Sequence, residues 1–185
     1  MTLQIKNKSE NVSTYIDAVL QNLHDYFSEK NITCYLFNIL SESYKVPAIL
    51  LNVDKMELGS DDGTGRFSLK VALSAYCIIN REDNNTRNSK ILRDIAADLM
   101  RLVMNNNFSC EDWVHLPFDI KSSNYEFDSH KTLECVKVNW SQTIFLGTNI
   151  WEESKYPIPK KIYLSHSPKI GKAYEGDYIC VAGNI

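Results

Sequence analysis

Residues 133–146 read LECVKVNWSQTIFL, and this stretch decides the fold. Apolar and polar side chains alternate along it, with the two-residue period of a strand that is buried on one face and wet on the other. One face would hold Val136, Val138, Trp140, Ile144 and Leu146, and the other Lys137, Asn139, Ser141 and Thr143. A wet face of that length indicates an antiparallel sheet that is covered on one side only.

Two segments with helical periodicity can supply that cover. The first begins at a cap on Ser9 or Asn11 and continues to about Ser28, with an apolar stripe of Tyr15, Ile16, Val19, Leu20, Leu23, Tyr26 and Phe27. The second begins at Thr86 or Asn88 and ends at residues 105–107. Its buried side would be Ile91, Leu92, Ile95, Ala96, Leu99, Met100, Leu102 and Val103.

The remaining apolar runs predict further strands. Residues 32–37 and 46–53 are short strand candidates, with a turn at 41–43 between them. Residues 67–79 alternate as a long strand, and the polar segment 54–65 would be the loop of a hairpin. Residues 108–130 carry no clear period and are expected to be irregular.

These elements define an α+β fold. We expect an antiparallel sheet of about four or more strands with two helices packed on one face, followed by an extended C-terminal arm. The core domain would span residues 1–147. Residues 148–185 would form a connector and arm that packs on the core or on a neighbouring subunit.

Composition narrows the functional classes. The formal net charge is −3, so the chain offers no overall basic surface for a phosphate backbone, and specific nucleic-acid binding is not expected. No apolar run approaches the roughly 18 residues of a membrane span, and residues 1–10 do not resemble a signal peptide. The five cysteines are scattered without metal-ligand spacing, which favours reduced thiols in a cytosolic compartment.

Four acidic residues cluster in the polar segment 54–65. Asp54, Glu57, Asp61 and Asp62 suggest a calcium site, but their spacing differs from that of an EF-hand loop. Glycine and aspartate are also the residues that a wide hairpin loop needs, so we interpret the segment as a solvated loop. The sequence Gly63-Thr64-Gly65-Arg66 lacks the lysine of a phosphate loop and precedes a strand rather than a helix.

The chain shows no recognisable catalytic motif. His166 lies between two serines, but neighbouring residues of a strand point to opposite faces, so we interpret it as a surface group. The pair Glu152 and Glu153 lies in the connector, where adjacent carboxylates cannot converge on one substrate. We therefore expect no enzyme activity, no cofactor and no metal.

Aromatic residues are concentrated in the connector and arm: Trp151, Tyr156, Tyr163, Tyr174 and Tyr178. They either pack the arm onto the chain's own sheet or form part of a protein–protein interface, where tyrosine and tryptophan are enriched. The sequence leaves both alternatives open.

The order of elements in the second half of the chain resembles a known family. A helix over 91–103 and an irregular stretch precede a strand that ends in VNWSQTIFLG, at residues 138–147. The ending combines Ile162-Tyr163-Leu164, Pro168-Lys169-Ile170-Gly171 and Asp177-Tyr178. This pattern is similar to the tail terminator (tail-completion) proteins of long-tailed bacteriophages, especially the Mu-like contractile-tail and prophage group. The residue-level match covers about the last fifty residues, and the polar loop at 54–65 departs from the pattern.

The resemblance implies a structural role in a virion tail that is assembled in a bacterial host. Such proteins form a ring, usually a hexamer, that caps the tail tube, stops tube and sheath polymerisation and docks the head connector. Acidic residues of the 54–65 loop would then line or cap the lumen, and the aromatic arm would serve an interface. The alternatives are another tail, neck or baseplate subunit, or a small-molecule-binding or hydrolytic α+β domain.

Overall fold

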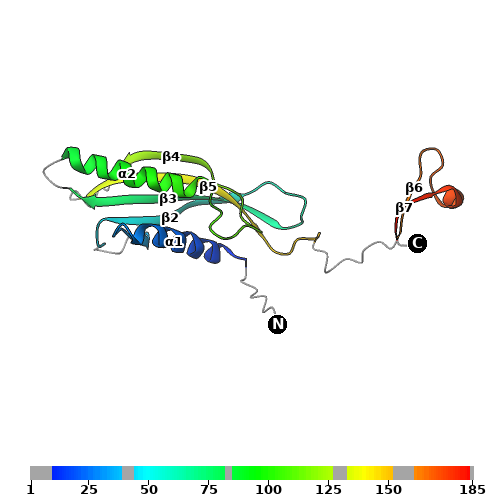
Figure 1. The fold of residues 1–185 in the computed structure, drawn as a ribbon, viewed down its shortest axis with the longest axis horizontal. Coiled ribbons are helices and arrows are strands. Elements are labelled where there is room, and N and C mark those ends of the chain that lie inside the picture. Colours follow the sequence, from blue (N-terminus) through cyan, green and yellow to red (C-terminus); the bar gives the residue numbers. More distant parts are fainter. Residues whose placement is uncertain (1–9, 39–43, 82–84, 127–132, 152–160, 184–185) are drawn as a thin grey trace, which may run out of the picture. The chain divides into compact units, whose positions relative to one another are not determined.

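A computed structural model describes residues 10–38, 44–81, 85–126, 133–151 and 161–183. The chain divides into two compact units, Met1–Gly147 and Thr148–Ile185. The first unit is an α+β domain in which a five-stranded sheet carries two helices on one face (Figure 1). The predicted α+β class, with both helices on one face of the sheet, is confirmed.

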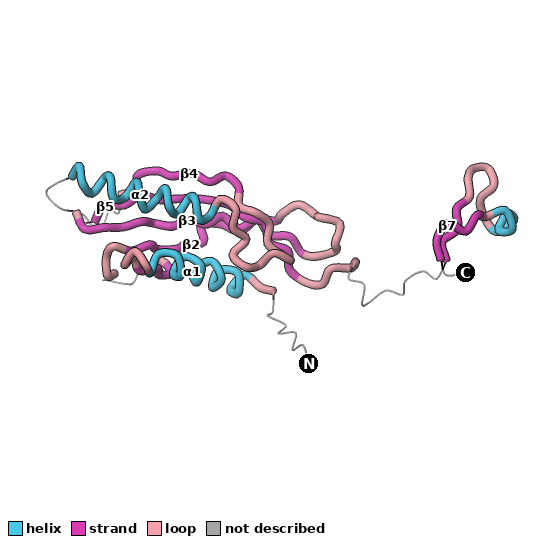
Figure 2. Tube along the Cα trace, viewed as in Figure 1, coloured by secondary structure: helices cyan, strands magenta, loops and turns pink. Residues whose placement is uncertain are grey.

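The sheet is mixed rather than wholly antiparallel. Its strands are β1 (Thr33–Leu36), β2 (Ala48–Leu58), β3 (Phe67–Asn80), β4 (Phe118–Tyr125) and β5 (Leu133–Leu146), in the order β1-β2-β3-β5-β4 (Figure 2). Neighbouring strands run antiparallel except β1 and β2, which run parallel. A parallel pair cannot be closed by a tight turn. The turn predicted at 41–43 lies outside the described residues.

Helix α1 (Val12–Ser28) begins where the sequence predicts it. Asn11 is the N-cap, and its Oδ1 accepts a hydrogen bond from the backbone N–H of Thr14 at 2.9 Å. Helix α2 spans Asn85–Val103. The two helices bury a stripe each against the same sheet face, made of Tyr15, Ile16, Val19, Leu23, Phe27, Leu92, Ile95, Ala96, Leu99 and Val103.

The sheet therefore has a helix-covered face and an open face. On β5, Val136, Val138, Trp140 and Ile144 belong to the helix-covered core, as the alternation predicts. Only part of the open face is polar. At the end remote from the β2–β3 loop it carries a second apolar cluster, made of Ala48, Leu50, Tyr76, Ile78 and Cys135 with Tyr35, Phe37, Tyr44, Val46 and Leu133 packed against it. Apolar and aromatic side chains thus cover part of the open face, which the polar residues predicted on this face of β5 do not indicate.

One buried amide joins α1, β5 and the segment after α2. The Oε1 atom of Gln142 accepts hydrogen bonds from the Tyr15 hydroxyl (2.5 Å) and from Trp140 Nε1 (3.3 Å). Its Nε2 donates to the carbonyl oxygens of Asn106 (3.2 Å) and His115 (3.0 Å). All four hydrogen-bonding positions of the amide are used, and Gln142 has no exposed surface. Burial of the Tyr15 ring raises the pKa of its hydroxyl, which therefore stays protonated as a donor.

Two predicted irregular segments contain strand. Residues 118–125 form β4, an edge strand that pairs with β5, although residues 108–130 were expected to be irregular. Its residues are exposed apart from the half-buried Ile120, so no apolar alternation marks the strand. Strand β2 continues to Leu58, and the loop before β3 covers only residues 59–66.

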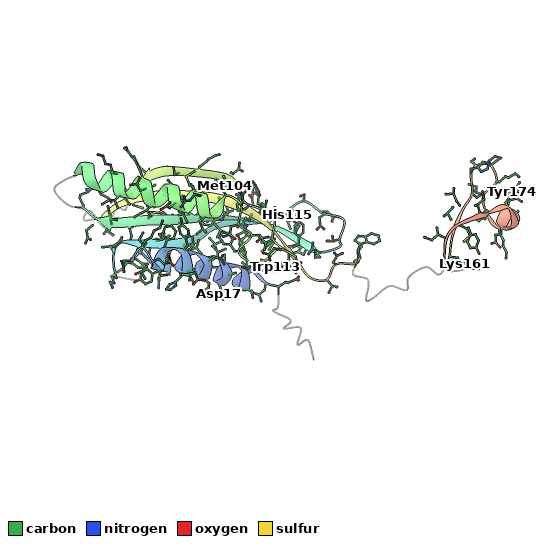
Figure 3. The ribbon with its side chains drawn as sticks, in the orientation of Figure 1. Asp17, Met104, Trp113, His115, Lys161 and Tyr174 are labelled. Atoms are coloured by element: carbon green, nitrogen blue, oxygen red, sulfur yellow. The ribbon has the colours of Figure 1, made fainter. Side chains whose placement is uncertain are left out.

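The second unit is a small antiparallel hairpin. Strand β6 (Lys161–Leu164) pairs with β7 (Ile179–Gly183), and the 3₁₀ helix η1 (Lys172–Asp177) lies in the connection between them. Lys161 begins β6, and Tyr174 lies in η1 (Figure 3). None of the side chains described in this unit is buried.

Candidate functional site

The acidic residues predicted as one loop cluster lie on two different elements. Asp54 is in β2, at a bulge where the pairing register with β3 skips from Val53 to Lys55. Its carboxylate accepts hydrogen bonds from Ser74 Oγ (2.7 Å), Asn52 Nδ2 (2.7 Å) and Lys137 Nζ (3.0 Å). Partial burial raises the pKa of Asp54, but these three donors outweigh it, and the net pKa lies below its usual value. Asp54 is therefore tied into the open face of the sheet.

The other three acidic residues also have partners. Glu57, in β2, forms an exposed ion pair with Lys55 at 2.6 Å, which lowers the pKa of its carboxyl. Asp61 accepts a hydrogen bond from the Gly63 N–H at 2.8 Å. Asp62 accepts hydrogen bonds from the Thr64 hydroxyl and backbone N–H and pairs with Arg66 at 3.1 Å. Asp61 and Asp62 thus order the loop through local turns.

Among the described residues, no group of three or more His, Cys, Asp or Glu side chains could hold a metal ion.

Arg66 extends the loop's contacts to the neighbouring segment. It donates to the Asp112 carbonyl oxygen at 2.8 Å and lies over the Phe145 ring at 5.0 Å. Arg66 thus joins the loop to the segment after α2 and to the end of β5.

The same hairpin carries an apolar surface that the sequence interpretation missed. Met56, Leu58 and Phe67, which we call the tip patch, are 53%, 78% and 52% exposed. Met56 pairs with Val71 and Leu58 with Leu69, so these side chains point to the helix-covered side of the sheet. The end of the β2–β3 hairpin reaches past α1 and α2, which leaves the tip patch without cover from either helix (Figure 1).

A signal for the tip patch was present in the sequence. The apolar period of β2 includes Val53, Met56 and Leu58 if one residue between Val53 and Met56 is counted as an extra residue. A bulge accommodates such an extra residue, so that the apolar side chains after it lie on the same face as those before it. The charged neighbours Asp54, Lys55 and Glu57 hid this period and favoured a loop.

The predicted aromatic residues of the second unit divide into two groups. Trp151, Tyr163 and Tyr174 are 71%, 52% and 43% exposed. The Tyr178 hydroxyl accepts a hydrogen bond from the Gly171 N–H at 2.6 Å, which closes the loop that contains η1. Tyr178 therefore has a structural role within the hairpin. Tyr156 lies outside the described residues.

A groove lies between α2 and β4. It consists of two cavities of about 300 and 470 Å³ that share Arg93, Asn124 and Val136. Glu134 borders the first cavity, is 9% exposed and has an Oε1 atom without a hydrogen-bond partner. Arg81 Nε lies 3.9 Å from this oxygen. The linings contain the hydroxyl groups of Ser122 and Ser123, the thiol of Cys135 and the carboxylates of Glu126 and Glu134.

The thiols do not form a reactive site in the first unit. Cys34, Cys77, Cys110 and Cys135 are buried, and Cys180 in β7 is exposed. Burial raises the pKa of Cys34 and of Cys135 to about 12, which keeps these groups protonated at neutral pH.

No helix among the described residues has the length and apolar content that a membrane crossing requires.

The sequence matches no known protein-family model, and no curated protein matches it.

Proposed function

We propose that this chain is a structural subunit that assembles into a ring, and that the ring acts as a phage tail terminator. The observation that carries the proposal is the placement of uncovered apolar surface. The tip patch is exposed at one end of a well-packed domain, and the second unit has no buried side chain among its described residues. Surfaces of this kind are typical of chains that complete their packing against other subunits.

The two surfaces differ, and this difference favours a ring over a two-fold dimer. In a symmetric dimer the same patch meets itself, whereas two unlike surfaces generate head-to-tail contacts that close into a ring when the rotation fits. The order of elements that resembles tail terminators favours the same outcome.

In the proposed role, the ring binds the head-proximal end of the tail tube and stops further addition of tube subunits. It contacts the last sheath ring in a contractile tail and offers a docking surface to the head connector. The protein would then be located in the virion tail. Another tail, neck or baseplate subunit is the closest alternative, because it would use the same surfaces for head-to-tail assembly.

The test is assembly of the full chain, alone and with purified tail-tube protein. Mass photometry and negative-stain electron microscopy are expected to show rings, and tubes grown with the chain are expected to be capped at one end and shorter than tubes grown without it. A chain that stays monomeric in both settings and leaves tube length unchanged contradicts the proposal. A chain that builds rings without capping tubes favours a neck or baseplate role.

A further inference from the structure

One face of the hairpin of the second unit carries three large apolar side chains. The register pairs Leu164 with Ile179 and Ile162 with Ala182, so Ile162, Leu164 and Ile179 share one side, which we call the arm face. Tyr163 and Cys180 share the opposite side. The three side chains of the arm face are 48%, 60% and 66% exposed.

A two-stranded hairpin of this size needs a surface to pack on. An isolated hairpin is only marginally stable in water, and an independent fold requires further strands or a covering layer. The arm face is the side on which such a layer would gain the most, because all three of its side chains are large and apolar. Within the described part of the second unit, no layer covers the arm face, and within the first unit neither helix covers the tip patch.

The two surfaces are also suited to meet in an assembly. Strand β5 ends at Leu146, which pairs with Phe67 of the tip patch, so the last strand of the first unit ends beside this patch. The 13 residues of 148–160 can span at most about 45 Å. The arm of one subunit can therefore reach the tip patch of an adjacent subunit when the hairpin ends lie within that distance.

We propose that the arm face of one subunit covers the tip patch of a second copy of this chain. The inference rests on the proposed ring, in which each copy must offer two unlike surfaces and both are present on this chain. Contact between Ile162, Leu164 and Ile179 on one side and Met56, Leu58 and Phe67 on the other buries apolar surface of both units. Each subunit would donate one arm and receive one, which closes a ring without a second protein.

The first experiment compares self-association of full-length variants by sedimentation velocity, alone and on tail tubes. The tip variant is Leu58→Ser with Phe67→Ser, and the arm variant is Leu164→Ser with Ile179→Ser. Each should weaken association about 100-fold, at roughly tenfold for each lost apolar contact. The matched control is Leu36→Ser, because Leu36 is a strand leucine with 47% exposure outside both surfaces. It should change association less than twofold.

These outcomes separate the inference from the proposed function. If the wild-type chain and both double variants all form rings, the proposed arm contact is wrong and the proposed ring still stands. A wild-type chain that remains monomeric with and without tubes overturns both. Circular dichroism checks folding, which exposed substitutions are expected to preserve.

The second experiment asks whether the arm reaches another chain. A tagged Leu58→Cys chain is mixed with an untagged Ile179→Cys chain, both with Cys180→Ser, and treated with a short bis-maleimide. A covalent dimer of tagged and untagged chains is expected, and a chain with all three substitutions should give a ladder of oligomers. An internally bridged monomer as the sole product would show that the arm covers its own chain, and absence of any bridge would exclude the contact.

Discussion

Replacing Gln142 with methionine is expected to lower the free energy of unfolding by about 4 kcal/mol. The side chain keeps its length but loses four hydrogen bonds, to Tyr15, Trp140, Asn106 and His115. A buried neutral hydrogen bond contributes about 1 kcal/mol net, and each stranded partner adds a desolvation cost when it finds no replacement. The four hydrogen bonds alone account for about 4 kcal/mol, a large part of the 5–15 kcal/mol typical of a domain. Any partner that stays unsatisfied raises the cost above this value.

Two comparisons make the magnitude specific. Tyr15→Phe removes one donor while Gln142 Oε1 still accepts from Trp140, so about 1 kcal/mol is expected. Gln21→Met is the same chemical change as Gln142→Met, but at an exposed position of α1, and should cost less than about 0.5 kcal/mol.

The assay is urea unfolding followed by tryptophan fluorescence. Trp113 and Trp140 report on the core, and Trp151→Phe removes the exposed signal. Equal slopes with a shifted midpoint would indicate a change in stability alone. A cost for Gln142→Met no larger than that for Tyr15→Phe would refute the reasoning, because the network would then contribute no more than a single bond.

Three further outcomes are expected. Deleting residues 151–185 should abolish ring assembly but leave the urea midpoint of the first unit almost unchanged, and rings formed by the truncated chain would exclude a role for the arm. The pKa of Asp54 is lower in the folded state than in the unfolded one, so its contribution to stability is complete above about pH 4 and is lost as pH falls through the folded pKa. The difference in unfolding free energy between wild type and Asp54→Asn should therefore shrink on acidification. A difference that stays constant with pH would contradict this. A thiol reagent should modify Cys180 in the native monomer and all five cysteines after denaturation, and rapid modification of the four buried thiols would contradict the packing.

Elements with a strong local signal were predictable from the sequence. Strand β5 has the predicted bounds, because its alternation is regular and one face is buried over its whole length. Helix α1 begins at Asn11 because its side chain satisfies an N–H that the helix leaves unpaired. In both cases, interactions within the segment decide the structure.

Elements that depend on a distant partner were not predictable. Strand β4 forms because β5 offers an unpaired edge, although its own residues are almost all exposed. The extension of β2 depends on the bulge at Asp54, which only the pairing with β3 defines. Local patterns carry little of this information.

The predicted site is subject to the same limit. Composition grouped four acidic residues, and the structure distributes them over a strand and a loop, where Lys137, Lys55 and Arg66 each pair with one of them. Three cations offset most of the local negative charge, which weakens any repulsion of DNA in a ring lumen. The tip patch has no comparable compensation, since Leu58 remains 78% exposed in the chain. Burial of Leu58 in a neighbour gains free energy that the paired carboxylates cannot supply, so the apolar end of the hairpin, rather than its acidic residues, is the stronger candidate for the contact that builds the ring.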